Sequence, residues 1–99
     1  MNDGIDAESK RKIIAVLAGL FPNVAIYLFG SRARGKHSVH SDIDIVLKGD
    51  EKISRYAIGE VVSMFEASSI PYRIEIVDFN SVSDSMRASI VQEGIIWKK

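Results

Sequence analysis

The spacing of hydrophobic residues divides the chain into helical and extended segments. Residues 7–20 have apolar side chains three and four positions apart, which predicts a helix that Asp6 caps and that ends before Pro22. Residues 24–30, VAIYLFG, are apolar at nearly every position, which is typical of a central strand covered on both faces. Residues 41–49 alternate between apolar and polar positions instead, which predicts a strand with one buried face.

The second half of the chain continues this alternation of helices and strands. Residues 52–67 carry an apolar stripe that includes Tyr56 and Met64, which predicts a helix with both of these side chains in the core. Pro71 then separates this helix from residues 72–79, YRIEIVDF, which alternate in the manner of a third strand.

The last segment predicts one more helix, over residues 82–92. Ser81 and Asp84 have the spacing of a capping box at its start, and Gly94 is placed to cap its end. Residues 95–97, IIW, are expected to add a short strand that either closes the core or faces a partner. The predicted fold class is therefore α/β (α+β): a small mixed β-sheet with helices packed on it.

Composition narrows the class of protein. With 99 residues, of which 46% are hydrophobic, we expect residues 1–99 to form a single domain with one modest core. The chain has no cysteine, which excludes disulfides and thiolate metal sites and suits a reducing cytoplasm. Its formal net charge is +0, so we expect neither direct nucleic-acid binding nor attraction to an anionic membrane. No apolar run is long enough for a membrane span, and we expect a cytoplasmic protein.

Two carboxylates stand on the polar face of the strand predicted over residues 41–49. Asp42 and Asp44 are two positions apart, so they point to the same side, roughly 7 Å apart along the strand. Like charges at this spacing repel each other, and a divalent cation such as Mg²⁺ removes that repulsion. A D-x-D pair is also common on a solvated strand face, so the pair alone does not decide between the two interpretations.

The strand predicted over residues 72–79 adds a third carboxylate. If the isoleucines of RIEIV face the core, Glu75 projects onto the side that carries Asp42 and Asp44, and Asp78 projects onto the other side. Three acids that converge from two strands favour a site for a divalent cation over a solvated face.

The loop between the first two strands has the complementary chemistry. Gly30 lets the backbone turn sharply and approach a ligand, and Ser31 offers a hydroxyl and an N–H group to phosphate oxygens. Arg32, Arg34 and Lys36 then supply positive charge, and the two histidines of the loop are expected to be exposed and without a role. The glycine–serine pair alone is typical of an ordinary turn, and the basic residues alone are typical of a solvated loop. Together with the acids, the loop predicts a site for a nucleoside triphosphate with Mg²⁺.

At these residues the sequence resembles a known family. The stretch GSRARGKHSVHSDIDIVL, residues 30–47, is similar to the signature of the polymerase-β-like nucleotidyltransferase superfamily, in which G-S and D-x-D precede a third acid on a later strand. It resembles in particular the minimal nucleotidyltransferase (MNT) domain, over nearly the whole chain. The resemblance implies the palm-like fold of these enzymes. It also implies Mg²⁺-dependent transfer of AMP from ATP to a hydroxyl group, with release of pyrophosphate.

The resemblance also implies roles for individual residues. The nucleotide-binding residues that it implies are Gly30, Ser31, Arg32 and Arg34. The catalytic residues that it implies are Asp42, Asp44 and Glu75, which would also bind two Mg²⁺ ions. The third acid is often Asp in the family and is Glu75 here, so the resemblance leaves open whether the site supports turnover.

A partner protein follows from the same resemblance. Many MNT proteins are antitoxins of a HEPN-domain ribonuclease toxin, and some add AMP to a tyrosine of that toxin. Two alternatives stay open. The chain could neutralise its partner by binding alone, or it could modify a small molecule, as aminoglycoside nucleotidyltransferases do.

Overall fold

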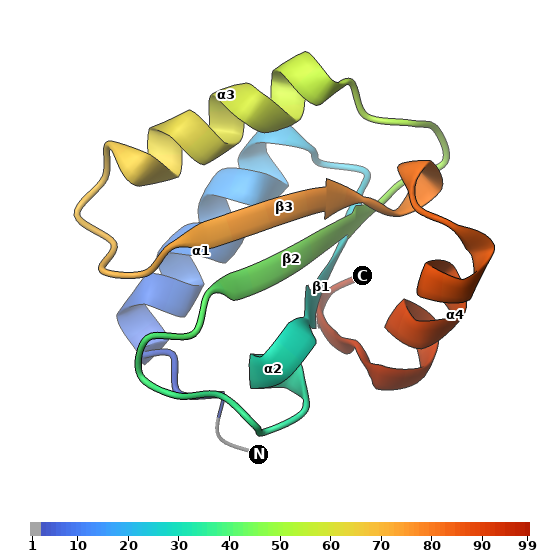
Figure 1. Ribbon diagram of the computed structural model, residues 1–99. Helices are drawn as coiled ribbons and strands as arrows, with labels where there is room; N and C mark the ends of the chain where they lie inside the picture. The colour runs from blue at the N-terminus through green and yellow to red at the C-terminus, as the bar shows by residue number, and fades with distance from the viewer. Residues whose placement is uncertain (1–2) are drawn as a thin grey trace.

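The computed structural model describes residues 3–99, and its helices and strands follow the order expected from the sequence (Figure 1). The helices are α1 (Ala7–Leu20), α2 (Gly30–Ala33), α3 (Arg55–Glu66) and α4 (Asp84–Glu93), with a 3-10 turn at Phe79–Ser81. The strands are β1 (Ala25–Phe29), β2 (Ile43–Lys48), β3 (Ile74–Asp78) and β4 (Ile95–Lys98). None of the helices in this part of the chain is long and apolar enough to cross a membrane.

The strands form one mixed sheet in the order β3-β2-β1-β4. Strand β1 is antiparallel to both of its neighbours, β2 and β4, whereas β2 and β3 are parallel and are connected through α3. The end of β1 and the starts of β2 and β3 therefore lie at the same end of the sheet. This arrangement brings the glycine-serine turn, which follows β1, beside the acids at the beginning of the other two strands.

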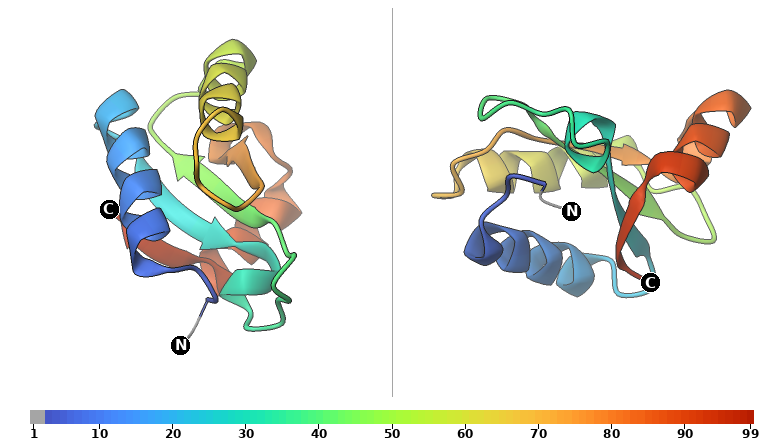
Figure 2. Two further views of the ribbon diagram at one scale, coloured as in Figure 1. Left: turned by 90° about the vertical axis from the view of Figure 1, so that its left-hand side faces the viewer. Right: turned by 90° about the horizontal axis from the view of Figure 1, so that it is seen from below.

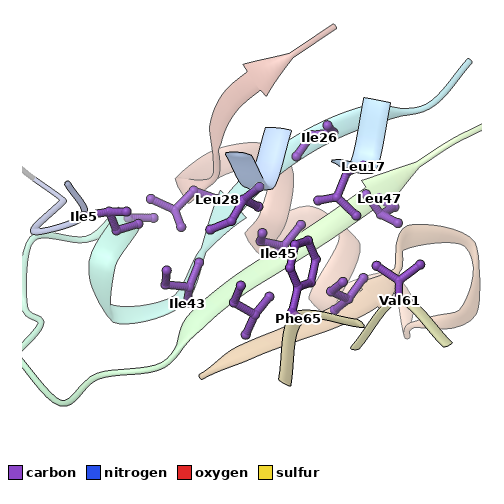
Figure 3. Close-up of a cluster of buried hydrophobic side chains, with 13 residues drawn as sticks. Ile5, Leu17, Ile26, Leu28, Ile43, Ile45, Leu47, Val61 and Phe65 are labelled. Atoms are coloured by element: carbon purple, nitrogen blue, oxygen red, sulfur yellow. The ribbon is translucent and has the colours of Figure 1, made fainter. Parts of the chain in front are cut away.

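The core lies between one face of the sheet and the helices α1 and α3 (Figure 3). The alternation predicted for β2 is confirmed, because Ile43, Ile45 and Leu47 are all fully buried on this face. Each such side chain contributes roughly 1.5–3 kcal/mol by leaving water, so the face that a strand buries is strongly fixed. Helix α4 lies on the opposite side of the sheet from α1, as the right panel of Figure 2 shows. The other sheet face is thus left partly open beside α4.

The start of α4 differs from the prediction. Ser83 is its N-cap and accepts a hydrogen bond from the N–H of Met86 at 3.2 Å, whereas Ser81 belongs to the preceding 3-10 turn. The reason is the buried Asp78, whose side chain accepts a hydrogen bond from the Ser81 hydroxyl at 2.7 Å. Because this contact uses Ser81 to close the end of β3, the helix begins only after the turn.

Helix α3 is shorter and less buried than predicted. It begins after Ser54, and only Val61 and Phe65 are buried among its residues. Tyr56 is 77% exposed and Met64 is 51% exposed, so their predicted core positions are wrong. Helix α3 packs on the sheet through a narrower part of its surface than the apolar residues in its sequence indicate. The side chains at the edges of the apolar stripe therefore face outward.

The C-terminal strand resolves an alternative that the sequence left open. Ile95 and Trp97 pack against the core, whereas Ile96 points outward and is exposed. The segment therefore closes the core on one side of the strand. Gly94 caps α4 as predicted, and its N–H donates to the carbonyl of Ile90 at 2.8 Å.

Candidate active site

Asp44 and Glu75 are direct neighbours on the parallel strands β2 and β3. Paired strands run about 4.8 Å apart, and both side chains line one pocket on the face opposite the core. Asp78 has the other parity, points inward and is 3% exposed. The placement predicted from strand phase is therefore confirmed for Asp44, Glu75 and Asp78, whereas Asp42 precedes β2 and does not line this pocket.

Asp44 is partly buried and lies near other acids, and both features raise its pKa. Burial raises the pKa of the Asp44 carboxyl to about 6, with further contributions from the Glu75 and Asp42 carboxylates and from a hydrogen bond to Glu75. The Arg34 guanidinium acts in the opposite direction and lowers this pKa. Negative charge is thus concentrated around Asp44, and a bound cation would remove the repulsion.

Asp42 lies just before β2 and is half-buried. The pairing of the two strands already begins there, because the Ile43 N–H donates to the Arg73 carbonyl at 2.9 Å. Within residues 3–99, no three His, Cys, Asp or Glu side chains gather closely enough to hold a metal ion by themselves, so the predicted convergence of Asp42, Asp44 and Glu75 on one metal site is not confirmed. Mg²⁺ is usually bound by one or two carboxylates together with substrate phosphates. The acids around Asp44 fit that type of open site and do not form a closed protein cage.

The turn after β1 is shaped for close contact with Asp44. Gly30 has a φ of +74°, a left-handed conformation that favours glycine, and it begins the single-turn helix α2. A Cβ atom at this position would overlap Asp44 Oδ2 and lie 3.0 Å from its Cγ. The helical turn expected for SRARG is confirmed, and it holds the half-buried Ser31 next to Gly30.

The two arginines of the loop have different environments. Arg34 is exposed, lines the same pocket as Asp44 and forms an ion pair with Glu93, with 3.5 Å between Nη1 and Oε1. Arg32 is 1% exposed, and its guanidinium donates to backbone carbonyls inside the protein. The predicted nucleotide contact is therefore consistent with the position of Arg34. It is not supported for Arg32, because the donors of that side chain are already directed at the main chain.

An open pocket of about 290 Å³ joins these residues to an apolar wall. Asp44, Glu75 and Arg34 supply its charges, and its apolar lining includes Phe29, Val46, Val77 and Met86. Sequence reasoning missed Met86, because α4 reaches the site only through the tertiary fold. The pocket combines groups for phosphates and a cation with a surface on which a flat ring can pack.

A larger hollow of about 650 Å³ lies along α3, around Tyr56 and Met64. Its lining contains one carboxylate, Glu60, and no basic residue. Size therefore does not identify the site, and the smaller pocket has the chemistry that catalysis requires.

The loop histidines differ from each other. His40 is exposed as expected, but His37 is half-buried, and its Nδ1 atom is buried without a hydrogen-bond partner in the described part of the chain. The expectation that both are exposed is thus wrong for His37. The segment around Gly4 packs against it, and no local pattern in the sequence indicates that contact.

Comparisons with known proteins agree with this geometry. Residues 11–98 match the family model described as polymerase beta, nucleotidyltransferase. The chain is 28% identical over 86 residues to a Haemophilus influenzae protein named "Probable protein adenylyltransferase MntA", and the match covers 87% of this chain and 75% of that protein.

Two solved structures are similar in fold as well as sequence. One is a toxin–antitoxin crystal structure with AMP-PNP, which contains a chain 30% identical to this one. The two chains superpose with a TM-score of 0.78, and the match covers 91% of this chain and 73% of that chain. The other contains a tri-AMPylated Shewanella oneidensis HEPN toxin with an MNT antitoxin, and it matches at 28% identity and a TM-score of 0.72, with coverage of 93% and 71%. The family match, the shared fold and the position of the acids lead to one conclusion: the chain belongs to the polymerase beta nucleotidyltransferase family.

Proposed function

We propose that this chain transfers AMP from ATP to a hydroxyl group of a partner protein, and that the partner is a HEPN-type toxin. The observation that carries the proposal is the Asp44–Glu75 pair, which faces a pocket beside the Gly30 turn. The similar MntA protein is named as a protein adenylyltransferase, and a similar MNT antitoxin is found with an AMPylated HEPN toxin. Both relatives support AMP as the group transferred and a protein as the acceptor.

The side chains divide the work according to their chemistry. Asp42, Asp44 and Glu75 would hold Mg²⁺, which supplies positive charge that neutralises the triphosphate and the charge that develops during transfer. Gly30 and Ser31 bind the phosphates through backbone N–H groups and the serine hydroxyl, and the close approach at Gly30 keeps them near the acids. Arg34, which is exposed at the pocket, contacts phosphate oxygens.

The reaction itself is a displacement at phosphorus. The acceptor oxygen forms a bond to the α-phosphorus of ATP, and the bond from that phosphorus to the bridging oxygen of the β-phosphate breaks, so pyrophosphate leaves. The acceptor proton passes to a carboxylate, for which Glu75 is the best placed because it is the more exposed member of the pair. We assign the acceptor to a tyrosine, because its ring can pack on the apolar wall while its hydroxyl meets the acids.

Radioactive transfer tests this proposal directly. The chain is incubated with α-³²P-ATP, Mg²⁺ and the HEPN-domain protein of the same genome, and label on the partner is measured. We expect labelling that disappears in Asp44→Asn and persists in the matched variant Asp50→Asn, whose side chain is exposed outside the site. A partner that stays unlabelled with the wild-type chain contradicts the proposal.

One observation favours neutralisation by binding alone as the second candidate. The Glu75 side chain is 51% exposed, and the acids within residues 3–99 do not enclose a metal site without a substrate. If toxin inhibition survives the replacement of both Asp42 and Asp44 by Asn, this second function is correct and the transfer reaction is not required.

A further inference from the structure

Arg32 occupies an unusual place for a residue in a basic loop. Its side chain is buried, and its Nε and Nη2 atoms donate to the Ser41 carbonyl at 3.1 and 2.8 Å. Its Nη1 atom donates to the Asp3 carbonyl at 2.9 Å. A buried guanidinium needs hydrogen-bond partners, and backbone oxygens from two separate segments accept from all three guanidinium nitrogen atoms of Arg32.

A third segment completes the surroundings of this guanidinium. The Arg32 Cζ atom lies 5.2 Å from the centre of the Tyr72 ring, within the range of a cation–π contact. The Tyr72 hydroxyl in turn accepts from the Asp6 N–H at 3.2 Å and lies 3.1 Å from Asp6 Oδ1. Arg32 thus links the segment before α1, the loop before β2 and the loop before β3.

Two of the linked loops, and the turn that carries Arg32 itself, are next to residues of the active site in the sequence. Arg32 follows Ser31 in the chain, Ser41 precedes Asp42, and Tyr72 stands three residues before Glu75. The Arg32 guanidinium is planar and rigid, and two N–H groups on one of its edges donate to the Ser41 carbonyl. It therefore fixes direction as well as distance.

We propose that Arg32 is a positioning residue, which holds the Ser41 carbonyl and thereby sets Asp42 against the Gly30–Ser31 turn for metal and phosphate binding. The inference rests on the proposed function, since it concerns the same site. It assigns Arg32 no contact with nucleotide. Residues that orient metal ligands from behind typically change metal affinity 10- to 100-fold when they are replaced.

Gly4 offers a way to disturb this arrangement without replacing Arg32. It has a φ of +73°, and a Cβ atom there would lie 2.5 Å from His37 Nε2 and 2.9 Å from Arg32 Nη1. The added methyl group in Gly4→Ala therefore displaces the Arg32 guanidinium from the side of the N-terminal segment. The expected effect on the metal site has the same direction as that of a change at Arg32 itself.

The test uses Mn²⁺ as a paramagnetic substitute for Mg²⁺ in the full chain, with a non-hydrolysable ATP analogue present to supply the phosphates. Broadening of the amide resonances of Asp42 and Asp44 is followed as Mn²⁺ is added, and thermal unfolding is measured in parallel. Arg32→Lys keeps the positive charge but lacks the planar guanidinium with its paired donors. We therefore expect that about tenfold more Mn²⁺ is needed to broaden these resonances to half their height. The control Arg11→Lys makes the same chemical change on the exposed surface of α1, and we expect no shift from it.

The outcomes separate this inference from the proposed function. A folded Arg32→Lys variant with the wild-type Mn²⁺ dependence overturns it, as does a loss of thermal stability without any change in that dependence. If Arg32→Lys fails to fold, Gly4→Ala decides by the same measurement. A wild-type chain that binds Mn²⁺ at Asp42 and Asp44 but labels no partner contradicts the transfer reaction only. The absence of any Mn²⁺ effect at these residues overturns the positioning role.

Discussion

Gly30 and Asp44 are packed so closely that residue 30 has no room for a side chain. The φ of Gly30 is +74°, and a methyl group on this residue would overlap the Asp44 carboxylate. The turn that is expected to bind phosphate is thus in contact with an acid that is expected to bind metal. Because a triphosphate with Mg²⁺ needs both kinds of group within a few ångströms, this contact is the structural basis of the site.

Gly30→Ala should abolish activity and also destabilise the fold. The left-handed backbone alone costs an alanine about 1–2 kcal/mol, and the overlap with Asp44 displaces the carboxylate as well. We expect AMP transfer to fall at least 100-fold, measured as label on the partner. Urea denaturation should show a lower free energy of unfolding.

The matched control for this change is Gly35→Ala. Gly35 has nearly the same φ, +71°, but a Cβ atom there meets no other atom within 4 Å. Gly35→Ala should therefore lose similar backbone stability and retain most of the transfer activity. Equal loss of activity in the two variants would contradict the importance of the contact with Asp44.

Asp44→Asn should stabilise the fold at neutral pH while it removes activity. The pKa of Asp44 is raised in the folded state from 3.8 to about 6, so the folded protein holds this proton more tightly than the unfolded chain does. The contribution of Asp44 to stability is therefore greatest below about pH 4 and is lost as the pH rises through 6. Asparagine removes the penalty that remains at pH 7, which we place at about 1 kcal/mol after solvent screening.

Urea unfolding at several pH values checks this prediction. Between pH 4 and 6, the wild-type chain should lose stability relative to Asp44→Asn, and above pH 7 the difference should be constant. A variant that is less stable than the wild type at pH 7 would show that the ionised Asp44 carboxylate stabilises the fold, which is the opposite of what its raised pKa requires.

Mg²⁺ with a non-hydrolysable ATP analogue should raise the melting temperature of the wild-type chain. A ligand present at 100 times its dissociation constant adds about 2.7 kcal/mol to the free energy of unfolding. We expect a smaller effect at pH 5 than at pH 7, because Mg²⁺ competes with the proton on Asp44, whose pKa is about 6. Asp42→Asn should reduce the Mg²⁺-dependent part of the shift. An equal shift in this variant would exclude Asp42 as a ligand.

Strand parity was sufficient to predict the positions of Asp44 and Glu75, but not that of Asp42, which precedes β2 and does not line the pocket. Ile43 and Ile45 flank Asp44, and Ile74 and Ile76 flank Glu75, so burying the isoleucines places these two acids on one face. This argument needs only local spacing, which the sequence contains in full.

The roles of the two arginines could not be predicted in the same way. Arg32 and Arg34 stand two positions apart in one short motif, yet one is buried and the other is exposed. The difference depends on the carbonyls of Asp3 and Ser41, which come from other parts of the chain. No local pattern in the sequence indicates where carbonyl groups from distant segments will lie. The same reason explains why Met86 was missed.

Met86 provides a test of the apolar wall. It lines the same pocket as the acids and belongs to α4, so a charge at this position should weaken the binding of a flat ring. We expect Met86→Lys to lower labelling of the partner at least tenfold, mainly through a higher KM for the acceptor with a smaller change in the KM for ATP. Met86→Leu keeps the apolar surface and should stay within about twofold of the wild type, since volume-conserving exchanges cost little.

The control for charge on the same helix is Val91→Lys, because Val91 is 62% exposed and lies outside the pocket lining. It should leave both KM values unchanged. If Met86→Lys instead raises the KM for ATP and leaves that for the acceptor unchanged, the wall holds the adenine base. The acceptor tyrosine must then reach Glu75 from the solvent side, where that carboxylate is half exposed.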